Sequence, residues 1–268
     1  IPSPVLAYTS LRGEMAGIIF PIALKSTSGR SRSIKLTNVC RITSLRPRHY
    51  QSHGNNMRGK FITIEGTEGV GKTTNIQFIQ DWLKSKQLAY ICTREPGGTP
   101  MAEQIRELLL TPREELVCDT AELLLMFAGR AQHLNQVIEP SLAEGAWVLC
   151  DRFTDATYAY QGAGRNMRSD LIAELELIVQ GSLRPDLTLI LDIPVEIGLQ
   201  RANERSEPDR FEREKAEFFH RVREGYLEIA QQNQDRCVVI DASQSLESVQ
   251  REISIALEAF WFSSEESG

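Results

Sequence analysis

The sequence predicts an α/β fold in which a five-stranded parallel sheet is covered by helices on both faces. Two observations support this fold class. Short apolar runs of strand length alternate with longer segments of helical periodicity, as in parallel sheets that are buried on both faces. A glycine-rich segment, GTEGVGKT at residues 66–73, follows the first apolar run and opens the first helical segment. After Met57 we find neither an internal repeat nor a linker, so residues 57–268 are expected to form one domain.

Five apolar runs are expected to form the strands, because each is short and rich in β-branched or aromatic residues. These runs are FITIE, LAYICT, WVLCD, LTLILDI and CVVID, at residues 61–65, 88–93, 147–151, 187–193 and 237–241. Helical periodicity fills the intervals between them. The helical segments are expected at about 72–86, 101–110 and 119–143, onward to about 180, and then at 195–204, 212–232 and 245–260.

The charge of the chain is unevenly distributed. Residues 1–56 hold eight basic side chains against one acid, which leaves 22 of the 30 basic and 35 of the 36 acidic residues in the remainder. Such an acidic body argues against nucleic-acid binding through bulk electrostatics. No apolar run reaches the roughly 18 residues of a membrane-spanning helix, so no membrane partner is expected. Any anionic ligand must therefore meet a local cluster of cations and backbone N–H groups.

Residues 1–56 are rich in serine and arginine and show no sustained helical or strand periodicity. We expect them to be an N-terminal extension that is disordered or not part of the native protein. Two alternatives stay open, namely an organelle targeting segment, whose composition this stretch resembles, and an ordered functional arm. The five cysteines form no CxxC pair and no cluster with histidine, so they are expected to be buried thiols of a cytoplasmic protein.

The glycine-rich segment, residues 66–73, has the pattern of a P-loop. Gly66, Gly69 and Gly71 let the backbone turn so that successive N–H groups point at phosphate oxygens. Lys72 would bring a positive charge to the terminal phosphates, and Thr73 a hydroxyl for magnesium. The segment also stands at a helix N-terminus, which favours anions. The sequence therefore predicts a site for a chain of phosphates.

This loop does not by itself distinguish a GTPase, an ATPase and a kinase. No NKxD motif is present, and no DxxG motif follows a strand, which disfavours a GTPase. The third strand instead ends in Asp151-Arg152-Phe153. An arginine at the carboxyl end of a strand points into the ligand crevice of an open α/β sheet. This arrangement favours a kinase whose acceptor is already anionic.

Four further motifs carry a resemblance to a known family. They are REPGGT, FAGR, DRF and AYQG, at residues 94–99, 127–130, 151–153 and 159–162. In this order they resemble the motifs of thymidylate kinases, which phosphorylate dTMP with ATP. The resemblance runs from about Met57 to Trp261.

The resemblance implies a P-loop NTPase fold of the nucleoside monophosphate kinase type, with Mg²⁺ as cofactor and a homodimer as the common assembly. It implies that dTMP becomes dTDP in dTTP biosynthesis. ATP would be bound by Gly66, Thr67, Glu68, Gly69, Val70, Gly71, Lys72, Thr73 and Thr74. The catalytic residues would be Lys72, Arg152 and Arg205, and the magnesium ligands Thr73 and Asp151.

The resemblance also assigns the pocket for dTMP. Phe127 occupies the position of the ring that stacks on thymine, and Arg130 resembles the contact to the base carbonyl. Arg94 and Arg152 resemble the pair that clamps the dTMP phosphate, for which a forked guanidinium is well suited.

The sugar is expected to contact two further residues. Glu68 matches an acidic position that engages the deoxyribose 3′-hydroxyl, and Tyr160 the side chain that crowds the 2′ position. Thr157 and Gln161 are weaker candidates for the same pocket.

Residues 201–212 resemble the lid that closes over ATP in this family. In one type of thymidylate kinase the P-loop carries a catalytic arginine, whereas in the other type the lid supplies it. The P-loop interior here contains no arginine and the lid contains three, so the chain resembles the second type. We expect Arg205 to be the catalytic arginine, with Arg201 and Arg210 as alternates.

Three alternatives stay open at this point. A different nucleoside or nucleotide kinase could share the fold, and a non-catalytic P-loop protein could share the loop. Asp241-Ala242-Ser243-Gln244, after the last strand, could hold adenine or simply cap the following helix.

Overall fold

The computed structural model describes residues 58–204 and 209–266. The predicted N-terminal extension, residues 1–56, and the predicted catalytic Arg205 lie outside the described residues. The strands form one five-stranded sheet in the order β2-β3-β1-β4-β5, and every neighbouring pair is parallel. This sheet confirms the predicted fold class.

All five predicted strands are present. The strands are β1 (Phe61–Glu65), β2 (Tyr90–Arg94), β3 (Trp147–Asp151), β4 (Leu187–Asp192) and β5 (Cys237–Asp241). The second prediction is displaced, because β2 starts two residues later and includes Arg94, and the fourth is one residue too long, because β4 ends at Asp192. The side chains of β1, the central strand, are all buried.

Helices fill the intervals between the strands, close to the predicted ranges. They are α1 (Lys72–Ser85), α2 (Pro100–Leu110), α3 (Asp119–His133), α4 (Glu139–Ala143), α5 (Thr154–Thr157), α6 (Ser169–Gln180), α7 (Val195–Asn203), α8 (Ala216–Gln232) and α9 (Leu246–Glu266), with π-helical segments η1 (Leu134–Ile138) and η2 (Tyr158–Gly164). In the part of the chain that the structure describes, no helix is long and apolar enough to cross a membrane.

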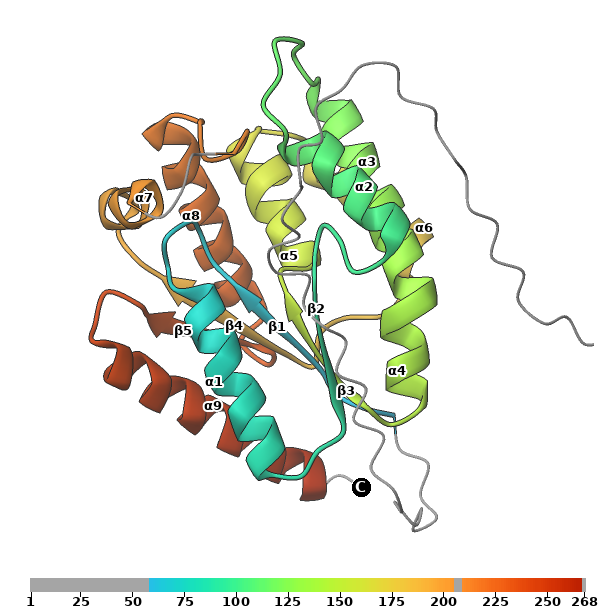
Figure 1. The fold of residues 1–268 in the computed structure, drawn as a ribbon, viewed down its shortest axis with the longest axis vertical. Helices are drawn as coiled ribbons and strands as arrows, with labels where there is room; N and C mark the ends of the chain where they lie inside the picture. Colours follow the sequence, from blue (N-terminus) through green and yellow to red (C-terminus); the bar gives the residue numbers. More distant parts are fainter. Residues whose placement is uncertain (1–57, 205–208, 267–268) are drawn as a thin grey trace, which may run out of the picture. The chain divides into compact units, whose positions relative to one another are not determined.

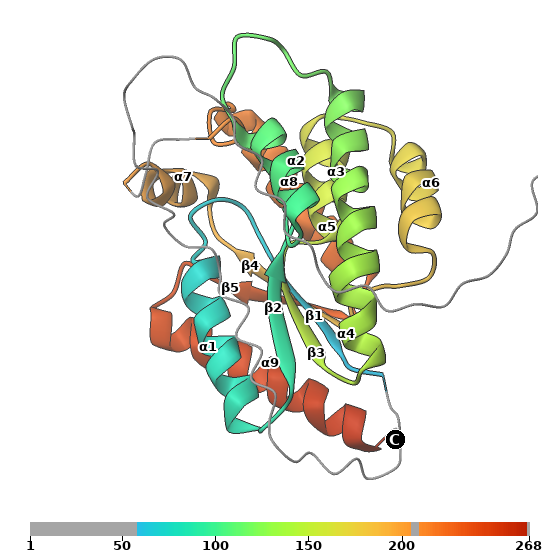
Figure 2. The same ribbon diagram turned by 45° about the vertical axis from the view of Figure 1, so that its right-hand side comes forward.

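Helices cover both faces of the sheet (Figure 1). On one face, α1 and α9 pack against strand side chains such as Ile64 and Leu149. On the other face, α8 packs against Ile190, while η1 and α4 pack against Val148. Figure 2 shows α2, α3 and α6 next to one another beyond this second layer, where α3 packs against both of the other helices.

The strand order brings distant motifs to one edge of the sheet. Ile64 of β1 is in register with Asp151 of β3, and Asp151 is in register with Arg94 of β2. The P-loop follows β1 directly, and Arg152 follows β3. Because all three strands run in the same direction, their carboxyl ends meet, and the site forms there.

The predicted helix over 119–143 is present, but its middle turn is widened. Residues Leu134–Ile138 are π-helical, and Pro140 lies in the first turn of α4. In a regular α-helix, the ring of a proline clashes with the carbonyl four residues earlier, and proline has no N–H to donate to it. Here that carbonyl belongs to the widened turn, which relieves the clash with Pro140. The periodicity of side chains predicts a continuous helix and does not reveal this local change.

Candidate active site

The P-loop has the backbone geometry that its glycines permit. Gly69 has a left-handed φ of 72°, and a Cβ there would lie 2.0 Å from the carbonyl oxygen of Gly198. The ammonium of Lys72 donates hydrogen bonds to the main-chain oxygens of Gly66 (3.1 Å) and Thr67 (2.9 Å). The lysine thus lies along the loop, at the N-terminus of α1, where anions bind favourably.

The environment of Lys72 disfavours the charged form of this side chain. Burial lowers the pKa of this lysine to about 8, and the nearby charge of Arg152 adds to the effect, while Glu68 and Asp151 oppose it. A ligand with several negative charges would raise that pKa again. The position of Lys72 therefore favours a ligand with several negative charges over a neutral one.

A cavity of about 420 Å³ lies between the P-loop and helices α2, α3 and η2. It collects most of the predicted site residues. Those on its wall are Glu68, Gly69, Val70, Gly71, Lys72, Thr73, Arg94, Arg130, Asp151, Arg152, Thr157, Tyr160 and Gln161. The predicted residues Gly66, Thr67, Thr74 and Phe127 are not among the described residues of this wall.

Arg152 lies in this wall and is held from several sides. Its backbone is left-handed, with a φ of 67°, which is uncommon outside glycine. One terminal nitrogen of its guanidinium donates to Glu68 Oε1 (2.7 Å), and the other donates to the hydroxyl of Tyr226 (3.2 Å). The guanidinium carbon is 4.8 Å from the ring centroid of Tyr160, whose hydroxyl donates to the same Glu68 oxygen (2.9 Å).

Arg130 is 3% exposed and is held by an ion pair that sequence reasoning missed. Its Nε donates to Glu95 Oε2 (2.7 Å), and one terminal nitrogen donates to Thr157 Oγ1 (2.8 Å). The other terminal nitrogen is buried and has no hydrogen-bond partner among the described residues. An unpaired buried donor is costly, so this nitrogen is suited to a carbonyl oxygen of a ligand in the cavity.

The second carboxylate oxygen of Glu95 contacts His133, at 3.0 Å from Nδ1, and His133 Nε2 lies 2.7 Å from the hydroxyl of Thr93. Burial acts to raise the pKa of Glu95, but Arg130 and His133 outweigh it and hold this pKa below its ordinary value. His133 is completely buried. The signal in the sequence was the REPGGT motif itself, whose glutamate serves as the anchor of Arg130.

Arg94 and Arg106 bring two further guanidinium groups to the cavity. Arg94 forms an ion pair with Glu103 (2.8 Å), and its Nε is buried without a hydrogen-bond partner among the described residues. Arg106, which sequence reasoning missed, donates to the main-chain oxygen of Pro96 (2.9 Å). Burial lowers the pKa of Arg106, and the charge of Arg94 contributes, so the arginines form one cationic cluster.

Phe127, which was expected to stack on a base, is 2% exposed and packs with Leu123 and Ile172 instead of lining the cavity. The residue before it, Met126, does line the cavity. Successive residues on a helix point about 100° apart, so a shift of one position changes the surface that a side chain reaches. The order of residues in α3 therefore directs Met126 to the cavity and Phe127 to the core.

Glu122 is another residue that sequence reasoning missed. Its side chain is fully buried on α3 and accepts hydrogen bonds from Gln161 of the cavity wall (2.8 Å) and from Arg210 of the lid (2.6 Å). Arg165 also forms an ion pair with it (3.3 Å). In this structure Arg210 therefore holds the end of the lid against α3.

The other alternate of the lid, Arg201, donates to the main-chain oxygen of Ala242 (3.3 Å). Ala242 lies in the segment 241–244 that was considered for adenine binding. Within this segment, Asp241 accepts hydrogen bonds from the backbone N–H (2.9 Å) and the hydroxyl (2.6 Å) of Ser243. These bonds form a compact turn, which is compatible with both readings of the segment.

Two oxygen ligands in the wall fit a magnesium ion. Oδ1 of Asp151 is buried and has no hydrogen-bond partner in the part of the chain that the structure describes. Thr73 is exposed at the start of α1 and lines the same cavity. Mg²⁺ typically keeps several waters and binds one or two protein oxygens together with phosphates, so this small set of hard ligands suits it.

Comparisons with known proteins agree with this geometry. The family model described as thymidylate kinase matches residues 64–253. A thymidylate kinase from Teredinibacter turnerae is 59% identical over 204 residues, which cover 76% of this chain and all of that protein. One from Pseudomonas putida is 58% identical over 201 residues, covering 75% and 96% of the two chains.

A solved structure is also similar. The crystal structure of thymidylate kinase from Ehrlichia chaffeensis has a TM-score of 0.60 and 33% sequence identity, covering 75% of this chain and 99% of that one. These relatives and this structure match the chain over nearly their whole length. The chain belongs to the thymidylate kinase family.

Proposed function

We propose that this enzyme transfers the γ-phosphoryl group of ATP to dTMP within the cavity described above. The products are ADP and dTDP, and the reaction is a step of nucleotide synthesis. The main observation in support is that the P-loop and Arg94, Arg106 and Arg152 line one cavity of about 420 Å³. A second anionic substrate placed opposite ATP needs such a cluster of cations.

The two ends of the cavity divide the phosphates between them. The N–H groups of the P-loop and the ammonium of Lys72 bind the phosphates of ATP. Arg94 and Arg152 hold the phosphate of dTMP, and Arg106 adds charge beside them. The acceptor oxygen is already anionic at neutral pH, so no side-chain nucleophile is required. Positioning and electrostatic stabilisation therefore account for the catalysis.

Magnesium belongs to this proposal as the cofactor. Thr73 and Asp151 would hold it, since both line the cavity and Oδ1 of Asp151 is unpaired among the described residues. When bound, Mg²⁺ neutralises charge on the phosphate oxygens.

The thymidine part of dTMP is assigned to the α3 and η2 side of the cavity. The unpaired nitrogen of Arg130 donates to a base carbonyl, and Met126 packs on the base in the place that had been expected for Phe127. Tyr160 and Glu68, joined by a 2.9 Å hydrogen bond, face the sugar. Thr157 and Gln161 complete this side, with Gln161 fixed by Glu122.

The lid supplies the remaining positive charge. We assign the catalytic role to Arg205, and the contacts of the two alternate arginines support this assignment. Arg210 is paired with Glu122, and Arg201 contacts Ala242. Closure of the lid would also exclude water from the transferring group.

We also propose that two chains assemble as a homodimer through α3 and α6. Exposed apolar side chains gather on these two neighbouring helices. They are Leu124 of α3, and Leu171, Leu177 and Ile178 of α6. Apolar patches of this kind commonly mark an interface between proteins.

The reaction is tested by measuring ADP production with ATP and Mg²⁺ while the acceptor is varied. The acceptors are dTMP, dUMP, ribothymidine monophosphate, dGMP and thymidine, and the full chain is compared with a version starting at Met57. We expect a strong preference for dTMP in both versions. Equal or better turnover of dGMP or thymidine would contradict the proposal, as would turnover of none of them.

A further inference from the structure

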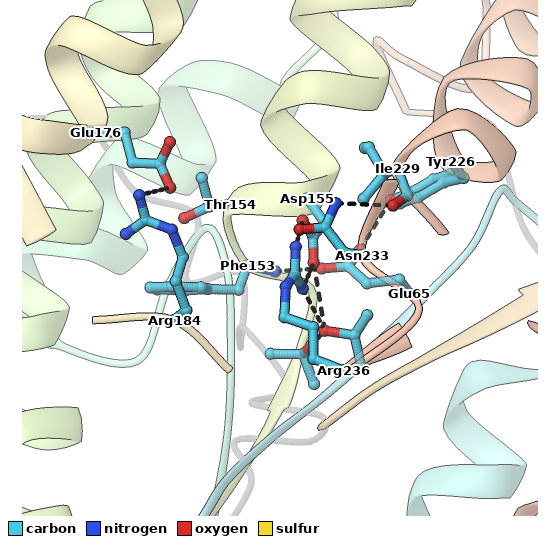
Figure 3. Close-up of polar contacts among 12 residues, drawn as sticks. Glu65, Phe153, Thr154, Asp155, Glu176, Arg184, Tyr226, Ile229, Asn233 and Arg236 are labelled. Carbon is cyan, nitrogen blue, oxygen red and sulfur yellow. Dashed lines mark hydrogen bonds and ion pairs between the residues drawn. The ribbon is translucent and has the colours of Figure 1, made fainter. Parts of the chain in front are cut away.

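Glu65 is a buried carboxylate at the end of β1 that the reaction described above does not use. Its side chain is completely buried, and it stands immediately before the P-loop. Oε1 accepts a hydrogen bond from the backbone N–H of Phe153 (2.7 Å), and Oε2 accepts one from the hydroxyl of Tyr226 (2.8 Å). Figure 3 shows Glu65 between Phe153 and Tyr226, beside the ion pair of Asp155 and Arg236.

Both of these hydrogen bonds lead to Arg152. Phe153 is the next residue in the chain, so its N–H fixes the peptide that leaves the left-handed backbone of Arg152. The hydroxyl of Tyr226 donates to Glu65 and accepts from a terminal nitrogen of Arg152 (3.2 Å). One carboxylate thus determines the position of the backbone and, through Tyr226, of the guanidinium.

The hydroxyl of Tyr226 is well placed to act on the arginine and not on the ligand. Tyr226 is 2% exposed, and neither it nor Glu65 is among the described residues that line the cavity. The other end of the guanidinium is bound to Glu68 (2.7 Å). The hydroxyl of Tyr226 opposes the pull of Glu68 on the guanidinium. Without that hydroxyl, the ion pair with Glu68 would draw the side chain of Arg152 toward the P-loop.

We propose that Glu65 and Tyr226 are positioning residues that hold Arg152 where it binds the phosphate of dTMP. This inference rests on the proposed role of Arg152. It makes a specific claim about binding: the Glu65–Tyr226 pair sets the affinity for the phosphate group and leaves the affinity for the nucleoside unchanged.

The test compares the dissociation constants of dTMP and thymidine, which differ only by the phosphate. Tyr226→Phe keeps the ring, which packs in the core near Tyr160 and Phe218, and removes only the hydroxyl. We expect the affinity for dTMP to fall by about tenfold, the effect of losing one hydrogen bond to a charged group, while thymidine binding is unchanged. A purely structural defect in the pocket would weaken both ligands together.

Tyr158→Phe is the matched control. The hydroxyl of Tyr158 also donates to a buried carboxylate, Glu176 (2.5 Å), but it has no hydrogen bond to Arg152. This variant should bind both ligands as the unsubstituted protein does. Glu65→Gln is the second variant, because it keeps the volume and can accept from Phe153, but it removes the charge that Tyr226 contacts. It should shift dTMP binding in the same direction if Tyr226→Phe does not fold.

Arg152→Ala distinguishes the phosphate-binding role of Arg152 from the positioning role of Glu65 and Tyr226. If Arg152 binds the phosphate, this variant loses most of the preference for dTMP over thymidine, and adding Tyr226→Phe causes no further loss. An unchanged preference in Arg152→Ala would overturn the proposed role of Arg152. The positioning role alone would be overturned if Arg152→Ala loses the preference for dTMP over thymidine while Tyr226→Phe and Glu65→Gln both keep it. A further loss of preference in the double variant would overturn it as well.

Discussion

At the scale of single residues, the neighbours Met126 and Phe127 show how closely function depends on helix phase. Phe127 is 2% exposed in a cluster with Leu123 and Ile172, whereas Met126 lines the cavity. A flat aromatic ring is the usual partner of a nucleobase. In the proposed complex the flexible, polarisable side chain of Met126 takes this place, since such a side chain can adapt its shape to the base.

Substitutions at these two positions should therefore have opposite effects. Met126→Ala should raise the KM for dTMP by about tenfold, because it removes an apolar contact worth about 1–3 kcal/mol. Phe127→Leu should leave that KM nearly unchanged and lower the free energy of unfolding by about 1 kcal/mol. Steady-state kinetics and urea denaturation measure the two quantities. A large KM effect in Phe127→Leu with none in Met126→Ala would restore the stacking role to Phe127.

The burial of Glu65 makes the stability of the folded protein depend on pH. Burial raises its pKa to about 7 from an ordinary value of 4.5, and Asp155 adds to this, while Arg152, Tyr226 and the N–H of Phe153 oppose it. The folded protein therefore binds the proton of Glu65 more tightly than the unfolded chain does. Stability from this group is fully present below about pH 4.5 and is lost as the pH rises toward about 7.

Glu65→Gln removes this dependence, since glutamine does not ionise. Relative to the unsubstituted protein, the variant should gain stability as the pH rises from 5 to 8, with an upper limit of roughly 3 kcal/mol from the pKa difference. The comparison concerns the change with pH, because the altered hydrogen bonds contribute a constant offset. Urea denaturation at several pH values measures it. Parallel stability curves for the two proteins would show that Glu65 titrates normally.

At the scale of elements, the lid is anchored at the end that follows residues 205–208. Arg210 binds Glu122 of α3, and its backbone N–H donates to Leu110 at the end of α2 (3.0 Å). Glu122 also holds Gln161, so one buried carboxylate joins the lid to the cavity wall. This arrangement suits an anchor, because a catalytic arginine must be able to reach the transferring group.

The two roles predict different losses of activity. Arg205→Met should lower kcat by about 10³-fold or more, as expected for an arginine that stabilises the transferring phosphoryl group. Arg210→Met should lower kcat by about tenfold or less, because it affects only how well the lid is held. Steady-state kinetics at saturating ATP and dTMP distinguish them. A reversed order of losses would transfer the catalytic role to Arg210.

The sequence predicted the elements better than it predicted their details. Strands β1, β3 and β5 have the predicted bounds, because each is a short apolar run bordered by polar or turn residues. Strand β2 is less apolar and only partly buried, which explains why its start was misplaced. The widened turn η1 was not predicted, since side-chain periodicity does not report a change of one residue in the backbone hydrogen bonds.

At the scale of the whole molecule, the parallel sheet explains why motifs far apart in sequence form one site. The motifs predicted the arginines and the glycine-rich loop that line the cavity, because these residue types are tied to phosphate chemistry. The partners Glu122 and Tyr226 could not be predicted, since a lone acid or tyrosine in a helix has no local signature. Glu95 lies in the REPGGT motif, but the motif does not show which arginine it contacts. Their roles depend on which helices the fold brings together.

The proposed homodimer would use a surface away from the cavity. On α6, Ile178 is 77% exposed and Leu177 is 70% exposed, and α6 packs beside α3, which exposes Leu124. A stable dimer buries about 1,200–2,000 Å² in total, which two adjacent helices can supply. Ile178→Glu should therefore convert the dimer to a monomer, because a charge in the centre of an apolar interface is left unpaired.

Ile255→Glu is the matched control for this prediction. Ile255 is 64% exposed on α9, which covers the opposite face of the sheet (Figure 1), so a charge there should leave the dimer intact. Size-exclusion chromatography with light scattering measures the mass of each variant. A monomeric unsubstituted protein, or a dimer that persists in Ile178→Glu, would contradict the proposed interface. A dimer lost only in Ile255→Glu would instead place the interface on α9.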